Sequence, residues 1–299
     1  MLNSNALGQS CSRNLPKAVA ISLMAAVINA LVTAGTKILG DDMAVFTIVC
    51  CQYAVGLLLC LPLLGGVRGA KNEIFRLTPS LFRLHLLRGV SGVAAFYAFY
   101  FAILQIPLAE ATLLRFAAPL FVPLLVLIWK NKVVPASRWP SLIVGFCGVL
   151  VILRPFGAQL SHWHLLGLLS ALGLAVSMVS TRELVGRTSS TAIIFFYFLL
   201  GCICSLPLAI VHWTPLSPFN WPILLTVGLG FFAAMQMNTR ALKFAKPSEV
   251  SPVGYCNVVF AGFLGWWIWG QVPDVWAWLG SLLVVVGALL IFRSDSGNV

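Results

Sequence analysis

The sequence predicts an all-α polytopic membrane protein with ten transmembrane helices, arranged as two inverted five-helix repeats around a central cavity. Three observations lead to this prediction. The chain of 299 residues is strongly apolar, its apolar residues fall into segments of membrane-spanning length, and its second half repeats its first. Such duplicated bundles are typical of carriers that alternate between the two sides of a membrane.

The composition excludes a water-soluble fold. Apolar residues make up 60% of the chain and charged residues only 9%, whereas a soluble domain carries about 25% charged residues. The mean hydropathy is +0.97, so lipid must solvate most of the surface. The net charge of +11 does not indicate nucleic-acid binding, because the basic residues cluster in short gaps between apolar segments, where they report membrane orientation.

Ten apolar segments each approach the roughly 20 residues that a bilayer requires. Pro107 and Pro247 stand at the starts of the fourth and ninth segments. The missing N–H of proline is harmless in a first turn, so both indicate helix starts. Because the gaps are short, consecutive helices are expected to be antiparallel neighbours. The predicted spans cover residues 17–38, 43–65, 84–105, 107–129, 137–155, 163–183, 190–211, 219–240, 247–270 and 274–293.

The second half of the chain duplicates the first. Residues 86–154 align without a gap on residues 225–293, at an offset of 139, and about 14 of the 69 pairs are identical. Residue types that are rare in this chain also match, because Glu110 aligns with Glu249. Each half holds five spans, and an odd number inverts the second copy in the membrane. The expected repeats are residues 14–156 and 157–294.

The basic residues predict the orientation of the bundle. If the N-terminus is cytoplasmic, 16 of the 19 Lys and Arg residues lie on the cytoplasmic side, as the positive-inside rule requires. Lys37 and Arg154 fall on the other side, and Arg115 falls within a span. Both termini are therefore predicted to be cytoplasmic. The cytoplasmic set is Arg13, Lys17, Arg68, Lys71, Arg76, Arg83, Arg88, Lys130, Lys132, Arg138, Arg182, Arg187, Arg240, Lys243, Lys246 and Arg293.

Several stretches resemble a known family. Residues 107–112 (PLAEAT) followed by 118–121 (APLF), and residues 247–252 (PSEVSP) in the second half, look like the fourth helix of an EamA domain. The endings GVLVI at 148–152 and GALLI at 287–291 are also typical. The chain, over about residues 14–294, resembles a ten-helix member of the drug/metabolite transporter superfamily. The resemblance implies a central substrate cavity lined by spans one to four and six to nine, with spans five and ten packed outside.

Arg115 is the strongest single candidate for a functional residue. It stands eight residues after Pro107, about 12 Å into the membrane at 1.5 Å per residue. An arginine near the midplane costs at least about 2.5–3.5 kcal/mol, so it should face the interior. Its guanidinium suits an anion clamp for a carboxylate or phosphate, although a structural arginine bonded to carbonyls or to Glu110 is the alternative. The duplicate position is Gly254, which leaves room opposite the arginine.

Glu110 and Glu249 have two interpretations. Each stands in a first helical turn, where a carboxylate stabilises the positive end of the helix dipole. Glu110 is alternatively a proton-coupling acid in the cavity. Other polar residues inside spans should also turn away from lipid, and tyrosine hydroxyls need partners. The remaining substrate-binding candidates are Thr112, Tyr97, Asn29, Gln52, Tyr197, Gln236, Tyr255 and Asn257.

The sequence therefore predicts a secondary transporter for a small organic metabolite in the cytoplasmic (inner) membrane of a bacterium. A carboxylate- or phosphate-bearing substrate suits Arg115. Export of amino acids or amphipathic drugs, and import of an aromatic vitamin such as riboflavin, are the alternatives that the resemblance leaves open. A lipid-modifying enzyme and a scaffold are remote, because no H-E-x-x-H, G-x-S-x-G or Walker A motif appears.

No cofactor or metal is expected either. The eight cysteines show no paired C-x-x-C spacing, and seven of them lie in apolar segments, where cysteine behaves as a small hydrophobe. The expected partners are the substrate and the bilayer. The sequence leaves open the transport direction, the coupling ion and homodimerisation through spans five and ten.

Overall fold

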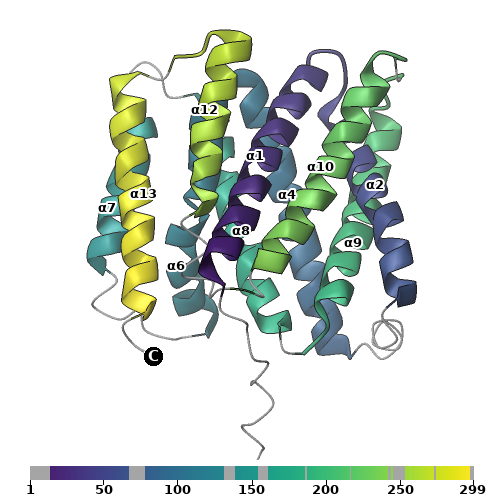
Figure 1. Ribbon diagram of the computed structural model, residues 1–299, viewed down its shortest axis with the longest axis horizontal. Coiled ribbons are helices and arrows are strands. Elements are labelled where there is room, and N and C mark those ends of the chain that lie inside the picture. The colour runs from purple at the N-terminus through teal and green to yellow at the C-terminus, as the bar shows by residue number, and fades with distance from the viewer. Residues whose placement is uncertain are drawn as a thin grey trace, which may run out of the picture.

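A computed structural model describes residues 14–66, 78–130, 139–153, 161–185, 187–215, 217–241, 244, 253–272 and 274–296. Regular structure in these ranges is helical, apart from one isolated bridge between Val185 and Thr188. The helices stand side by side in one bundle (Figure 1). They are α1 Leu15–Leu39, α2 Val45–Gly66, α4 Pro79–Gln105, α5 Leu108–Phe116, α6 Ala118–Lys130, α7 Trp139–Leu153, α8 His162–Leu184, α9 Ser190–Val211, α10 Asn220–Ala241, α12 Cys256–Trp269 and α13 Val275–Ser296.

Local sequence explains where the helices begin. The Asn14 side chain accepts a hydrogen bond from the Lys17 backbone N–H at 3.1 Å and so caps α1. Ser161 and Ser189 cap α8 and α9 in the same way. Each cap supplies an acceptor to an N–H that has no partner within its own helix. Gly270, with a φ of 64°, ends α12 in the left-handed conformation that glycine adopts without strain.

Seven helices among the described residues are long and apolar enough to cross a membrane, and shorter apolar helices cover residues 142–151, 256–269 and 275–287. The exposed surface carries large apolar side chains such as Trp267, Leu58 and Ile210, as a lipid-facing surface should. The protein is therefore a membrane protein with several apolar helices. Each predicted span overlaps a helix, and the largest boundary difference in the first half is α4, which begins at Pro79 rather than at residue 84.

The fourth predicted span is interrupted at its centre. Helix α5 ends at Phe116 and α6 begins at Ala118. Pro119 explains the interruption, because it has no N–H to donate to the carbonyl of Arg115 four residues earlier. The second half is interrupted at the matching place, since residues 253 and 254 are helical, Tyr255 forms a turn and α12 follows.

The helices pack reciprocally. The offset of 139 residues relates α4 to α10 and α7 to α13, and the order of the helices within each half relates α1 to α8 and α2 to α9. The most extensive packing joins α4 to α8, α1 to α10, α2 to α9 and α7 to α13. If the two halves are exchanged, the α4–α8 pair becomes the α10–α1 pair. The α2–α9 and α7–α13 pairs each map onto themselves. The interruptions also meet, because the Tyr255 ring packs at a tilt on that of Phe116, its duplicate position, with the centroids 5.8 Å apart.

The first helices of the two halves run in opposite directions. Near the end of α1, the Lys37 Nζ donates to the Ile106 carbonyl at 3.1 Å, so α1 and α4 end at the same side of the bundle. Glu110, just after this point, pairs with His164 in the first turn of α8. Helix α8 therefore begins at the side where α1 ends. The start of α1 and the end of α13 lie together at the lower side of Figure 1.

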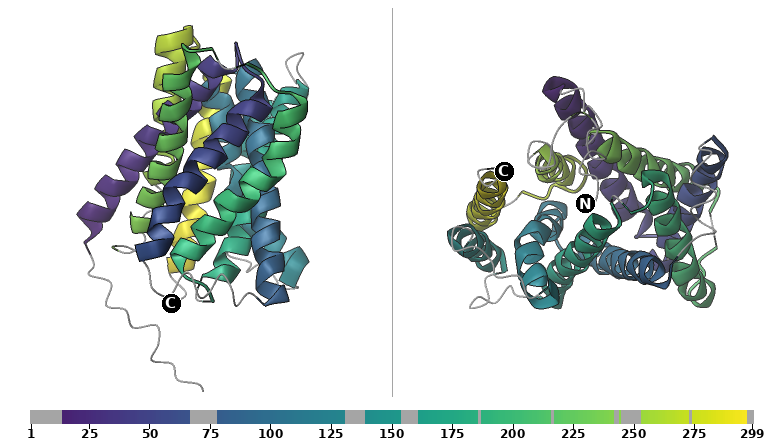
Figure 2. Two further views of the ribbon diagram at one scale, coloured as in Figure 1. Left: turned by 90° about the vertical axis from the view of Figure 1, so that its right-hand side faces the viewer. Right: turned by 90° about the horizontal axis from the view of Figure 1, so that it is seen from below.

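Helices α7 and α13 form a closely packed pair at the edge of the bundle (Figure 2). A Cβ added to Gly148 on α7 would lie 2.6 Å from the Val284 backbone N and 2.8 Å from the Gly280 carbonyl oxygen on α13. Backbone atoms cannot move aside as a flexible side chain can. Glycine at this position therefore permits the close approach of the two helices.

We expect Gly148→Ala to lower the melting temperature of the detergent-purified protein, because the methyl group must push α7 and α13 apart. Overpacking of this kind costs about 1–3 kcal/mol. Gly262→Ala is the matched control, since its added Cβ would meet only Ala109 Cβ at 3.6 Å. Equal melting temperatures for the two variants would contradict the close packing of α7 on α13.

Candidate functional site

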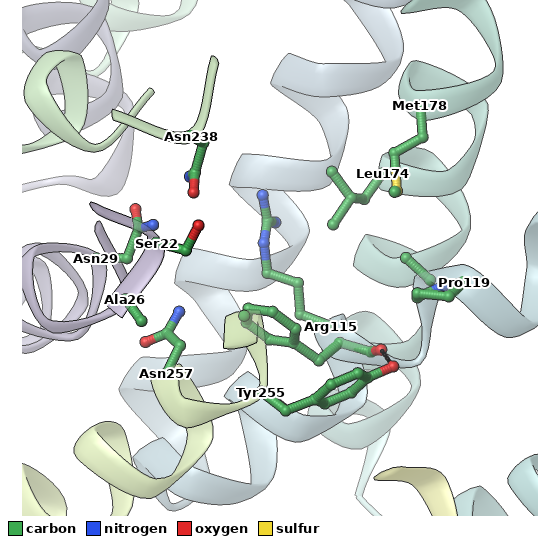
Figure 3. A pocket seen from close by; sticks show the side chains of 13 residues that line it. Ser22, Ala26, Asn29, Arg115, Pro119, Leu174, Met178, Asn238, Tyr255 and Asn257 are labelled. Atoms are coloured by element: carbon green, nitrogen blue, oxygen red, sulfur yellow. Dashed lines mark hydrogen bonds between the residues drawn. The ribbon is translucent and has the colours of Figure 1, made fainter. Parts of the chain in front are cut away.

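A cavity of ≈ 310 Å³ lies between helices of both halves. The side chains around it come from α1, α5, α6, α8, α10, α12 and the residues just before α12, and most of them point into the open space (Figure 3). Both interrupted spans contribute their break points. The lining residues are Ser22, Ala26, Asn29, Arg115, Phe116, Ala118, Pro119, Leu174, Met178, Asn238, Gly254, Tyr255 and Asn257.

Arg115 supplies the charge of this cavity. Its Nη1 donates to the Ala95 carbonyl of α4 at 3.2 Å. The guanidinium also lies 4.4 Å from the Phe96 ring centroid and 4.7 Å from that of Phe99. The side chain is 9% exposed. These contacts hold the guanidinium in place through one neutral acceptor and two ring faces, which stabilise a cation without neutralising it.

No acidic side chain pairs with Arg115 in the described part of the chain. Glu110, on the same helix, pairs instead with His164, with 3.4 Å between Oε2 and Nε2. Of the two forms of the structural alternative, the salt bridge to Glu110 is absent from this conformation, whereas a hydrogen bond to a carbonyl is present, at Ala95. Of the 13 lining side chains, Arg115 is the only Lys, Arg, Asp or Glu. The lining side chains that the structure describes therefore carry a formal charge of +1.

Gly254, at the duplicate of the arginine position, also lines the cavity. A Cβ added there would have Phe116 as its nearest neighbour, at 3.5 Å, which is an ordinary contact. One copy of this position thus carries a long cationic side chain, and the other copy carries none.

Neutral polar groups line the opposite side of the cavity. Ser22 and Asn29 share one face of α1 with Ala26, because residues four and seven apart project in the same direction. Asn257 comes from the start of α12, and Asn238 comes from the end of α10 (Figure 3). The Ser22 Oγ and the Asn257 Oδ1 are buried without a hydrogen-bond partner. Sequence reasoning missed Ser22, although its spacing from Asn29 on an otherwise apolar helix is a usable signal.

Four of the nine predicted substrate-binding residues line the cavity, namely Arg115, Asn29, Tyr255 and Asn257. The Tyr255 hydroxyl donates to the Phe116 carbonyl at 3.5 Å. The other five predicted residues do not line this cavity. They are Thr112, Tyr97, Gln52, Tyr197 and Gln236.

Three of these five belong to a buried aromatic and amide cluster between α2, α4 and α9. The Tyr53 hydroxyl donates to that of Tyr197 at 3.2 Å, and Tyr100 donates to the Gln52 Oε1 at 2.7 Å. Tyr97 packs on the Phe46 ring at 5.3 Å. The two hydrogen bonds join neighbouring helices, which is a common use of polar groups inside a membrane, whereas the Tyr97 hydroxyl and the Gln52 Nε2 are buried without a hydrogen-bond partner.

Two further cations lie inside the bundle. Arg88, which the sequence assigned to the cytoplasmic side, is buried within α4, where its Nη1 donates to the Ile193 carbonyl at 2.9 Å and its guanidinium covers the Tyr197 ring. The earlier start of α4 explains the difference. Lys37 is also buried, against the Ile106 carbonyl and the Trp269 ring. Arg154, Pro247 and Glu249 lie outside the described residues.

The described residues include no group of three or more His, Cys, Asp or Glu side chains that could hold a metal ion. The chemistry of the cavity is thus that of a binding site, with one cation, several neutral hydrogen-bonding groups and an apolar side formed by Leu174 and Met178.

Comparison with known proteins agrees with this description. A solved crystal structure with 18% sequence identity superposes with a TM-score of 0.61 and covers 96% of this chain and 100% of that chain. This likeness shows the fold. Among curated proteins, a pseudopaline exporter of Pseudomonas aeruginosa is 30% identical over 284 residues, which cover 94% of this chain and 96% of that protein.

Two other relatives are transporters of different solutes. An S-adenosylmethionine uptake transporter of Rickettsia prowazekii is 23% identical, over 92% of this chain and 91% of that protein. A riboflavin transporter of Brucella anthropi is 25% identical, over 83% of this chain and 87% of that protein. Residues 16–154 and 161–293 both match the EamA-like transporter family. The chain therefore belongs to the EamA-like transporter family, and it is a transmembrane transporter rather than an enzyme.

Proposed function

We propose that the protein is a secondary active transporter that moves a small organic anion, bearing a carboxylate or a phosphate, across the cytoplasmic membrane of a bacterium. The observation that carries this proposal is the guanidinium of Arg115, which lies in the cavity without an acidic partner among the described residues. A substrate anion would supply the missing negative charge. Charge-assisted, bidentate bonds to such a group are stronger than bonds between neutral groups.

The mechanism we propose is alternating access between two inverted five-helix halves, residues 14–156 and 157–294, with both termini cytoplasmic. Three observations support it. The helix pairs are exchanged when the halves are exchanged, α8 runs opposite to α1, and the duplicate positions Phe116 and Tyr255 touch. A residue contacts its own duplicate when a two-fold axis passes between them, and in inverted-repeat carriers the substrate binds near that axis.

Contacts between the halves close the end of the bundle where α1 ends. Glu110 pairs with His164 there, and the Leu108 N–H donates to the Gln271 Oε1 at 3.0 Å. At the other end, Asn238 lines the cavity and is exposed. We infer that this conformation opens toward the side where α1 begins, and that transport requires these contacts to separate.

The relatives do not decide the substrate, because their names give three different solutes and include both an exporter and uptake transporters. The chemistry of the cavity favours an anion. A cationic drug would need a carboxylate, and none of the lining residues carries one. An aromatic vitamin is the second candidate, because the rings of Phe116 and Tyr255 both line the cavity and could stack on a flat ligand.

Arg115→Ala should abolish transport of an anionic substrate. A thermal-shift screen of the purified protein against a metabolite library would identify binders, since a ligand of the folded state raises its melting temperature. Flux of the best anionic binder into proteoliposomes should then fall at least about tenfold in the variant, because each charge-assisted hydrogen bond contributes about 1.5–3 kcal/mol. Arg115→Lys should recover only part of the flux, because lysine lacks the planar fork. Unchanged flux in Arg115→Ala, with equal insertion, would contradict the role of the guanidinium.

Arg115→Met should leave the melting temperature of the ligand-free protein unchanged or raised, because it removes a buried charge that has no acidic partner in the described structure. The matched control is Lys37→Met, which also replaces a buried cation. This control should lower the melting temperature, at a cost of about 1–3 kcal/mol, since the carbonyl of Ile106, which ends α4, loses its donor. The Ala95 carbonyl lies within α4 and keeps its helical hydrogen bond when Arg115 is replaced. A large fall for Arg115→Met would instead assign the arginine to folding.

A further inference from the structure

The side of the cavity that faces Arg115 presents amide and hydroxyl groups. In Figure 3, Ser22, Asn29 and Asn238 lie across the open space from the guanidinium, with Asn257 below them. They come from α1, α10 and α12, so helices of both halves contribute. We call these four residues the amide wall.

Two atoms of the amide wall lack partners although they are buried. Asn257 is 6% exposed and Ser22 is 3% exposed, and neither the Asn257 Oδ1 nor the Ser22 Oγ makes a hydrogen bond. Leaving such a group unsatisfied is unfavourable. Both residues line the cavity, so a change of side-chain rotamer would present these atoms to a bound molecule. This cost in the empty protein would be recovered on binding.

The charge of the cavity limits what the amide wall can hold. An anionic group on Arg115 neutralises the formal charge of +1 that the described lining side chains carry. A second ionised group at the wall would then be buried opposite side chains that carry no charge to balance it, which is costly. An asparagine side chain both donates and accepts, and so does a serine hydroxyl. Hydroxyl and carboxamide groups on a ligand match these properties.

From these observations we infer that the substrate is a monoanion with neutral hydroxyl or amide groups, and that the amide wall selects it. The inference rests on the proposed function, and it narrows the substrate class from small organic anions to polar monoanions. The anionic end binds Arg115, the neutral polar end binds Asn257, Ser22 and the neighbouring asparagines, and Leu174 and Met178 form the apolar side of the cavity beyond Arg115. Simple fatty acids should bind poorly because they form no hydrogen bonds with the amide wall. Sites built to hydrogen-bond a ligand hydroxyl strongly reject analogues that lack it.

The test uses the purified full-length protein and a panel of monocarboxylates in matched pairs. One member of each pair carries hydroxyl or carboxamide groups, and the other is the unsubstituted acid of the same chain length. Uncharged polyols and linear polyamines complete the panel. At least one polar monocarboxylate should raise the melting temperature at concentrations at which its unsubstituted partner, the polyols and the polyamines do not.

Substitutions in the amide wall should then weaken that binder selectively. Asn257→Leu and Ser22→Ala should each reduce its affinity about tenfold, the effect of losing one hydrogen bond of about 1.4 kcal/mol. The matched control is Asn220→Leu, because Asn220 is buried at the closed end of the bundle, outside the cavity lining. Its side chain contacts Asp42 at 3.5 Å. This control should leave the affinity unchanged even if it lowers the melting temperature of the empty protein.

The outcomes separate the inference from the proposed function. If Arg115→Met abolishes binding and the substitutions at Asn257 and Ser22 do not weaken it, the amide wall is overturned while the anion site stands. Equal shifts from the unsubstituted acids would also overturn the amide wall. If no monocarboxylate binds in a way that depends on Arg115, the inference fails. If polyamines or polyols bind best, both the inference and the proposed function fail.

Discussion

The cost of holding one positive charge inside a lipid-embedded bundle shapes the centre of this protein. An exposed arginine at this depth would face hydrocarbon, so the guanidinium of Arg115 has to be covered by protein. Phe96 and Phe99 provide ring faces, and Ala95 provides a carbonyl. None of these contacts cancels the charge. The positive charge of Arg115 therefore has no compensating negative charge among the described residues, and in the proposed function a bound anion compensates it.

The interrupted spans give the charge its position. Pro119 ends the regular hydrogen bonding one turn after Arg115, and the second half breaks its helix at Tyr255. Irregular backbone is tolerated at membrane depth where it lines a cavity, and both breaks do so. Duplication placed the two breaks against each other, and divergence then gave one half the arginine and the other half Gly254. Both copies of this position line the cavity, one with a cationic side chain and the other with glycine.

Much of the architecture could be predicted from sequence, for a physical reason. A span must be about 20 apolar residues long, so hydropathy locates helices, and the offset of 139 residues located the duplicate positions. The inward orientation of Arg115 could also be predicted, because a charged side chain within a span avoids lipid. The alignment likewise identified Gly254 as its duplicate position. It was much harder to predict from the sequence which other polar residues face the cavity. Tyr197 and Gln52 turn toward α4 and the tyrosine cluster, while Asn238 reaches the cavity. Helices that are apolar on all sides give little indication of their rotation about their own axes.

Burial of Arg88 illustrates the same limit. The positive-inside rule counts charges near the ends of spans and cannot tell a loop arginine from one that folds back onto a neighbouring carbonyl. The pairing of Glu110 with His164 depends on the packing of α5 against α8, which no local pattern encodes.

The most direct test of the account is an experimental structure of the protein with a bound anionic substrate. The account predicts a carboxylate or phosphate oxygen about 2.7–2.9 Å from the Arg115 guanidinium nitrogens, with the rest of the molecule extending toward Asn257. A ligand bound elsewhere in the bundle, with its charged group paired to another residue and Arg115 still covered only by Phe96 and Phe99, would contradict it.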